Sequence, residues 1–309
     1  MNHPLDAELL DFLSELAAAA ETAPEPTLDS GRQKYCDGYR ARGPQPKTDI
    51  DTRDIALPSG AKMRLYTPQD LKSDALVLYA HGGGFVLGGV ETYDLQSRWL
   101  AEQTGQRIVS LDYRLAPEHI FPAAAQDAVA AYDLILSEGL ATPDRIILSG
   151  DSAGGCLCLV AALQAVADGR APARVVALYP VTDMTRPRGD APLTGSMLEF
   201  ASGFYLEALE MRWFREQYLP DPADAADWRA SVINAPDLSG LPPTWIINAR
   251  VDPLFDQGVE FADKLRTAGV DVTHQVHQGV VHNFMEHVSF SPSARKAALD
   301  VAVALTLPE

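Results

Sequence analysis

Short apolar runs alternate with longer segments of helical spacing through the middle and the end of this chain. Mostly aliphatic runs predict buried strands at residues 75–80, 107–111, 145–149, 174–179, 244–248 and 271–276. The segments between them predict helices at residues 93–104, 123–137, 153–168, 256–268 and 293–305. Strands that alternate with helices of this length form a mainly parallel sheet with helices on both faces, so an α/β fold is expected.

The N-terminal part of the chain shows a different pattern. An amphipathic helix that docks on the rest of the protein is predicted by the spacing of Leu5, Leu9, Leu10, Leu13, Leu16 and Ala17. Residues 21–50 hold most of the Pro, Gly and Thr of this end, so a loop-rich connection is expected there. Two alternating runs at residues 54–57 and 62–66 then predict a hairpin that supplies the antiparallel edge of the sheet.

Residues 181–241 interrupt the alternation, because no convincing strand occurs in them. Two helices are expected at residues 197–205 and 206–218, and both carry aromatic side chains. An insertion of this length is usually functional, so we interpret it as a cap over one end of the sheet. The alternative is that its aromatic residues form only the core of a small subdomain. With the insertion interpreted as a cap, the main α/β domain comprises residues 51–180 and 242–309. Cap helices come from residues 1–50 and from the insertion at residues 181–241.

Composition and charge exclude several classes of partner. The chain has 309 residues, enough for a sizeable core, and a net charge of −17. Nucleic acids and anionic membranes require a basic face, so neither is expected as a partner. No apolar run reaches the roughly 18 residues of a membrane span, and acidic residues interrupt the apolar start, so no span and no secretion signal are expected. An odd count of 3 cysteines indicates reduced thiols and a cytoplasmic protein.

Candidate chemistry begins at Gly150-Asp151-Ser152-Ala153-Gly154, which lies between a predicted strand and a predicted helix. In that context Gly-x-Ser-x-Gly predicts a nucleophile elbow, a tight turn that forces Ser152 into strained backbone geometry and exposes its hydroxyl. The Ala153 amide would begin the helix and face developing negative charge. Asp151 is interpreted as a structural part of the elbow. The alternative, a glycine-rich turn without chemistry, would be reasonable if the motif stood alone.

A glycine loop follows the predicted strand at residues 75–80, with the sequence His81-Gly82-Gly83-Gly84-Phe85. Consecutive glycines cost backbone entropy, and they allow a close approach to a ligand. We therefore predict that the amides of Gly83 and Gly84, together with that of Ala153, form an oxyanion hole. His81 and Gly82 are expected to support the loop, because the base of such a site comes later in the chain.

A serine nucleophile requires a base and a carboxylate that orients the base. Among 7 histidines, His282 is the predicted base, because it falls between the last predicted strand and the last predicted helix. His287 is the alternative. Asp252 follows the strand at residues 244–248 and is the predicted carboxylate, with Asp256 interpreted as a helix cap. The order Ser152, Asp252, His282 is the order that this strand-turn-helix architecture uses for a catalytic triad.

Five motifs in this order resemble the hormone-sensitive-lipase-like group of α/β-hydrolases, the bacterial carboxylesterases with a His-Gly-Gly-Gly motif. They are His81–Phe85, Asp112–His119 with Phe121–Ala124, Gly150–Gly155, Asp252–Leu254 and His282–Phe284. The resemblance implies an eight-stranded sheet, a helical cap, hydrolysis of short-chain acyl esters and a possible homodimer. Asn283 departs from the Gly that often follows the histidine in such enzymes, and Val232 departs from a common Pro.

The expected substrate is a small-molecule ester, and no metal or cofactor is expected, because no ligand cluster with metal spacing appears. Two alternatives stay open. The same triad could hydrolyse amides or formamides, and the same scaffold could serve as a non-catalytic ligand-binding protein, because a fold does not by itself establish catalysis.

Overall fold

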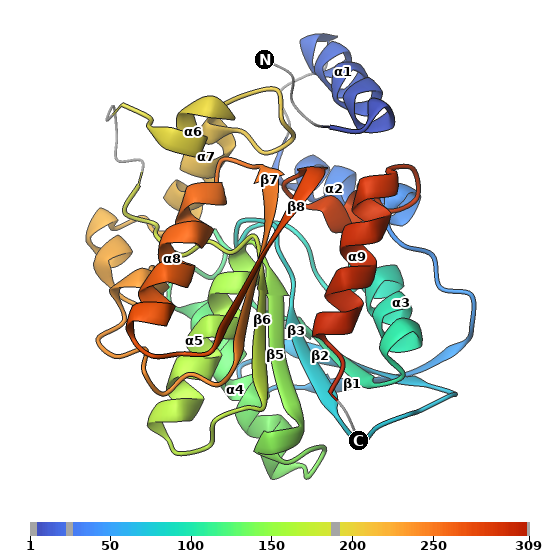
Figure 1. Cartoon of the computed structure of the whole chain (residues 1–309), viewed down its shortest axis with the longest axis vertical. Helices are drawn as coiled ribbons and strands as arrows, with labels where there is room; N and C mark the ends of the chain where they lie inside the picture. The colour runs from blue at the N-terminus through green and yellow to red at the C-terminus, as the bar shows by residue number, and fades with distance from the viewer. Residues whose placement is uncertain (1–4, 23–26, 187–191, 308–309) are drawn as a thin grey trace.

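The computed structural model describes residues 5–22, 27–186 and 192–307, and within them one eight-stranded sheet forms the centre of the protein (Figure 1). Its spatial order is β1-β2-β4-β3-β5-β6-β7-β8. The strands are β1 Ile50–Ala56, β2 Lys62–Pro68, β3 Leu76–Ala80, β4 Arg107–Asp112, β5 Ile146–Asp151, β6 Arg174–Leu178, β7 Thr244–Val251 and β8 Val272–Val281. β2 is antiparallel to both of its neighbours, and every other neighbouring pair is parallel. The predicted mainly parallel sheet with a hairpin at its edge is confirmed.

Two groups of helices cover the sheet on opposite faces (Figure 1). The helices α4 Ala123–Ser137, α5 Ala153–Ala167 and α8 Phe255–Thr267 pack in one core, whereas α3 Asp94–Thr104 and α9 Pro292–Ala304 pack in the other. Every residue of β3 and of β5 is buried between these layers. Because central parallel strands are covered on both faces, nearly all of their residues are apolar, and they appear in the sequence as continuous apolar runs.

The last two strands run further than the sequence predicts. β7 and β8 continue past residues 248 and 276, and Ala249 pairs with His277 and Val251 with Val281. The polar residues Arg250, His277 and Gln278 interrupt the apolar pattern in these extensions, so the pattern alone ended both strands early. As a result, Asp252 and His282 each directly follow a paired strand.

The expectation of a loop-rich connection at residues 21–50 is wrong in its middle, where helix α2 spans Leu28–Arg42. Gly31 and Gly38 lower helix propensity there, and few residues of α2 are apolar. A capping box between Thr27 and Ser30 begins the helix. A Cβ on Gly38 would overlap Glu286, so this glycine permits close packing of α2 on the segment after β8.

The insertion is only partly helical in the way predicted. The helix expected at residues 197–205 is wrong, since α6 spans only Gly195–Glu199. Gly203 and Tyr205 have φ values of 81° and 75°, which a right-handed helix cannot include. The second helix, α7, spans Ala208–Tyr218 and lies close to the prediction.

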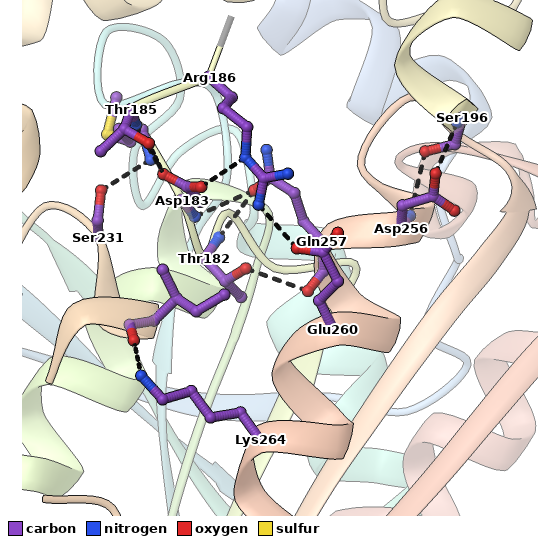
Figure 2. Close-up of polar contacts among 12 residues, drawn as sticks. Thr182, Asp183, Thr185, Arg186, Ser196, Ser231, Asp256, Gln257, Glu260 and Lys264 are labelled. Atoms are coloured by element: carbon purple, nitrogen blue, oxygen red, sulfur yellow. Dashed lines mark hydrogen bonds and ion pairs between the residues drawn. The ribbon is translucent and has the colours of Figure 1, made fainter. Parts of the chain in front are cut away.

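Polar contacts fasten the insertion to the start of α8 (Figure 2). The amides of Thr182 and Asp183 donate to Gln257 Oε1 at 3.2 and 3.1 Å, and the Ser196 amide donates to Asp256 Oδ2 at 2.8 Å. Asp256 therefore binds the insertion and does not cap its own helix as the sequence suggested, since Leu254 occupies the N-cap position. These contacts lie within a few residues of Asp252 and hold the insertion next to it.

The first helix, α1, spans Ala7–Thr22 and lies near the end of β7 and β8 (Figure 1). Leu9 and Leu13 are buried against Val251 and Val281, the last residues of those two strands. The amphipathic pattern at the start of the chain thus corresponds to a docked helix. In the described part of the chain, no helix has the length and apolar character that crossing a membrane requires.

Candidate active site

Three side chains from distant parts of the sequence meet at one end of the sheet. Ser152 Oγ lies 3.0 Å from His282 Nε2, and His282 Nδ1 lies 2.7 Å from Asp252 Oδ2. Ser152 is 8% exposed, His282 5% and Asp252 0%. A neutral imidazole held in this way can accept the hydroxyl proton, and the carboxylate can stabilise the cation that results.

The turn around Ser152 has the geometry that the sequence motif predicts. Ser152 directly follows β5 and directly precedes α5, and its φ and ψ are 53° and −115°. Such a conformation is strained for a residue with a side chain. A Cβ on Gly154 would overlap the Ala80 carbonyl of the neighbouring strand, so only glycine fits there. Ala153 is the first residue of α5, which leaves its amide without an intrahelical acceptor.

The glycine loop lies beside this turn. Gly83 and Gly84 have φ values of 101° and 62°, and in the described part of the chain their amides donate to no protein acceptor. A Cβ on Gly84 would overlap the ring of Phe214 in α7, so the insertion packs directly on the loop. These two amides are available to a ligand oxygen.

The alternative acid and base do not meet Ser152. His287 is 0% exposed and packs among Phe12, Tyr205 and Phe290. Burial is the main cause that lowers the pKa of His287 to about 3, so its imidazole is neutral. The Asp256 carboxylate, as described above, binds the insertion. His81 lies close to its own loop, with Nδ1 2.7 Å from the Gly82 carbonyl oxygen, as expected for a supporting residue.

Asp151, the residue before Ser152, accepts hydrogen bonds from three groups in the interior. Its Oδ1 accepts from the Tyr79 hydroxyl at 2.8 Å and the Gly82 amide at 3.0 Å, and its Oδ2 accepts from the Tyr93 hydroxyl at 2.9 Å. Burial raises the pKa of Asp151 to about 6, although the hydrogen bonds from Tyr79 and Tyr93 lower it. Sequence reasoning missed both tyrosines, because each appears only as one apolar position of a strand or a helix.

This raised pKa predicts a pH-dependent contribution of Asp151 to stability. The folded value of about 6 lies above the reference value of 3.8, so the folded state binds a proton that the unfolded state releases. The contribution is therefore fully present below about pH 4 and is lost as pH rises through 6, on the order of 3 kcal/mol in total. Urea unfolding of the parent and of Asp151→Asn between pH 4 and pH 7.5 measures it. The parent should lose stability relative to the variant as pH rises, and a difference that does not change with pH would contradict the assignment.

Comparisons with known proteins identify the class. A family model described as the alpha/beta hydrolase fold matches residues 77–286. Carboxylic ester hydrolase LipN of Mycobacterium tuberculosis is 37% identical over 255 residues, which cover 78% of this chain and 66% of LipN. Ethyl acetate hydrolase of Pseudomonas putida is 37% identical over 251 residues, which cover 79% of this chain and 77% of that protein.

Solved structures agree with these relatives. A hyperthermophilic esterase from Pyrobaculum calidifontis superposes with a TM-score of 0.86 at 34% identity, covering 98% of this chain and 98% of that one. An esterase from the bacterial hormone-sensitive lipase family superposes with a TM-score of 0.84 at 29% identity, covering 97% and 98% of the two chains. The chain belongs to the α/β-hydrolase family and, within it, to the hormone-sensitive-lipase-like carboxylesterases. The resemblance inferred from the five motifs is confirmed.

Proposed function

We propose that this chain is a serine carboxylesterase that hydrolyses short-chain acyl esters through an acyl-enzyme intermediate on Ser152. The observation that carries the proposal is the continuous contact from Asp252 Oδ2 through His282 to Ser152 Oγ, at 2.7 and 3.0 Å. The amides of Gly83 and Gly84, which donate to no acceptor among the described residues, support the same proposal.

In the acylation step, His282 Nε2 takes the Ser152 proton as Oγ attacks the ester carbonyl carbon. The carbonyl oxygen becomes an oxyanion, which accepts hydrogen bonds from the amides of Gly83, Gly84 and Ala153. When the tetrahedral intermediate collapses, the bond to the alcohol oxygen breaks, and His282 gives its proton to that oxygen. An acyl group on Ser152 and a free alcohol result.

In the deacylation step, a water molecule loses a proton to His282 Nε2 and attacks the acyl carbonyl carbon. The same amides stabilise the second oxyanion. The bond from carbon to Ser152 Oγ then breaks, and the proton returns from His282 to Oγ. The carboxylic acid leaves and the serine is regenerated, so no group outside the substrate and water is consumed.

Two observations favour short acyl chains. Phe214 of α7 packs on Gly84, and Ser152 is only 8% exposed, so little space lies above the nucleophile. In addition, one relative is named an ethyl acetate hydrolase, and its substrate has a two-carbon acyl group. We therefore expect the acyl pocket to hold a short chain and to exclude a long one.

Hydrolysis of 4-nitrophenyl esters from acetate to dodecanoate tests the proposal. We expect kcat/KM to be highest among the shortest esters and to fall by about tenfold or more toward dodecanoate, because a chain that cannot enter the pocket loses its binding energy. The matched 4-nitroanilides should react far more slowly. A rate that rises steadily with chain length would overturn the short-chain claim, and anilides that outpace the esters would favour an amide hydrolase.

A further inference from the structure

A chain of close polar contacts links the segment after β8 to the end of β5. The Tyr39 hydroxyl donates to Asn283 Oδ1 at 2.5 Å and lies 2.8 Å from the Tyr93 hydroxyl. The Tyr93 hydroxyl donates to Asp151 Oδ2 at 2.9 Å. None of the four residues is more than 3% exposed. Water therefore does not compete for these bonds, and they are stronger than their counterparts at the surface.

Each end of this chain of polar contacts lies one residue along the sequence from a proposed catalytic residue. Asn283 directly follows the proposed base, and Asp151 directly precedes the proposed nucleophile. The Gly82 amide donates both to the Tyr93 hydroxyl at 3.1 Å and to Asp151 Oδ1 at 3.0 Å, which fixes the start of the glycine loop. This chain of polar contacts thus touches the segment of the proposed base, the elbow and the glycine loop at the same time.

Tyr39 is the one residue in this chain of polar contacts that lies outside the α/β domain. It lies in α2, 244 positions before its partner Asn283. A second contact reinforces it, because Arg42 of α2 forms an ion pair with the buried Glu286, and Asn283 Nδ2 donates to Glu286 Oε2 at 3.0 Å. Both contacts therefore hold the segment after the proposed base to α2.

The backbone of Asn283 explains why its side chain can serve in this way. Its φ is 63°, in the left-handed region that Asn tolerates better than most residues with a side chain. A glycine would adopt the same backbone conformation and would offer no acceptor to Tyr39. The asparagine thus adds a side-chain contact at a position where the backbone alone requires none.

We propose that Tyr39 is a positioning residue for the reaction, which through its hydrogen bond to Asn283 sets the His282 imidazole at its working distance from Ser152. This inference rests on the proposed function, since it names what orients the proposed base. The distance in question is the 3.0 Å between His282 Nε2 and Ser152 Oγ. A displacement of about 1 Å at a reacting group can cost on the order of 10²-fold in rate.

Tyr39→Phe tests the inference, because it removes the hydroxyl and keeps the ring. We expect kcat per active site to fall roughly 10- to 100-fold while KM changes by less than about threefold, since the substrate does not contact Tyr39. Active sites are counted by titration with a 4-nitrophenyl phosphonate, so that unfolded protein does not enter the rate. A kcat per titrated site within about twofold of the parent would overturn the proposal.

Tyr35→Phe is the matched control. Tyr35 lies one turn before Tyr39 on α2, and its hydroxyl lies 2.9 Å from that of Tyr93. Among the residues that the structure describes, its hydroxyl forms no hydrogen bond with Asn283. Loss of this hydroxyl should leave kcat per site within about twofold. If Tyr35→Phe and Tyr39→Phe lower kcat equally, loss of a buried hydroxyl in general explains the effect, and the specific role of Tyr39 is wrong.

Asn283→Gly removes the acceptor and keeps the backbone conformation accessible. If Tyr39 acts through Asn283, adding Tyr39→Phe to Asn283→Gly should change kcat by less than about twofold, because both substitutions break the same bond. Effects that multiply would show that Tyr39 acts by another route and would overturn the proposal.

A structural readout separates this inference from the proposed function. Crystal structures of the parent and of Tyr39→Phe give the distance from His282 Nε2 to Ser152 Oγ without any turnover. A longer distance in the variant supports the positioning role even if the parent cleaves no ester in the series. An unchanged distance overturns the role even if the parent is an active esterase.

Discussion

Ser152→Ala is expected to lower kcat for 4-nitrophenyl acetate by about 10⁴- to 10⁶-fold and to change KM by only a few fold. In the proposed mechanism the Ser152 oxygen bonds to the acyl carbon, and alanine offers no nucleophile in its place. The oxyanion amides and the surrounding packing stay, so substrate binding and a small residual rate should remain. Steady-state kinetics on the purified variant, with its fold checked by circular dichroism, measures both parameters.

Ser149→Ala is the matched control for this result. Ser149 lies in the same strand as the elbow, is 0% exposed, and donates to the Val176 carbonyl oxygen at 2.8 Å. Its loss can cost about 1 kcal/mol of stability but should leave kcat nearly unchanged. If Ser152→Ala retains a tenth or more of the parent rate, the hydroxyl of Ser152 is not the nucleophile and the proposed mechanism fails.

Asp252→Asn is expected to lower kcat on the order of 10⁴-fold. The carboxylate accepts from His282 Nδ1 at 2.7 Å, so it keeps the proton on Nδ1 and leaves Nε2 free to accept one from the serine. An asparagine amide can instead donate to Nδ1, which favours the tautomer with the proton on Nε2. That tautomer cannot act as a base toward Ser152. The remaining contact, from the Leu254 amide to Oδ1 at 2.8 Å, should keep the side chain in place.

Asp256→Asn distinguishes this effect from the loss of any nearby carboxylate. Asp256 lies four positions further and binds the Ser196 amide of the insertion. We expect this variant to keep kcat within about tenfold of the parent, with any change appearing mainly in KM as the insertion shifts. Equal losses in the two variants would show that the local negative charge, and not the orientation of His282, is what matters.

Local sequence was sufficient to predict the elbow. The elbow consists of a strand, a turn with two glycines around Ser152, and a helix, which follow each other without interruption. Neighbouring residues alone therefore determine the turn that strains the serine. The glycine loop could be predicted for the same reason, because it follows β3 directly. Alternation of apolar strands and helices then predicted the sheet that brings these two segments side by side.

The choice of base and acid needed more than local sequence. Histidines 282 and 287 both follow the last predicted strand, and only chain order and resemblance favoured the first. The structure separates them by packing, since Phe12 of the distant helix α1 lies against His287. The strand extensions to Val251 and Val281 were also hidden, because pairing between β7 and β8 continues through polar residues.

Helix α2 and its contacts could not be predicted from periodicity. Its glycines lower helix propensity, and its buried face is formed by Gly38 and Tyr39, which a hydrophobic pattern does not single out. The bond from Tyr39 to Asn283 joins residues 244 positions apart. Only Asn283 gave a signal, as a departure from the glycine common in the family, and its meaning required the structure.

The most direct test of the account is to identify the residue that reacts with an alkyl 4-nitrophenyl phosphonate. This reagent mimics the tetrahedral intermediate and leaves a stable bond on an activated serine. The account predicts that release of one equivalent of 4-nitrophenol accompanies complete loss of esterase activity, and that peptide mass spectrometry finds the phosphonyl group on Ser152. Rapid inactivation with the label on another residue, or an active enzyme that the reagent never labels, would contradict the assignment of Ser152 as the nucleophile.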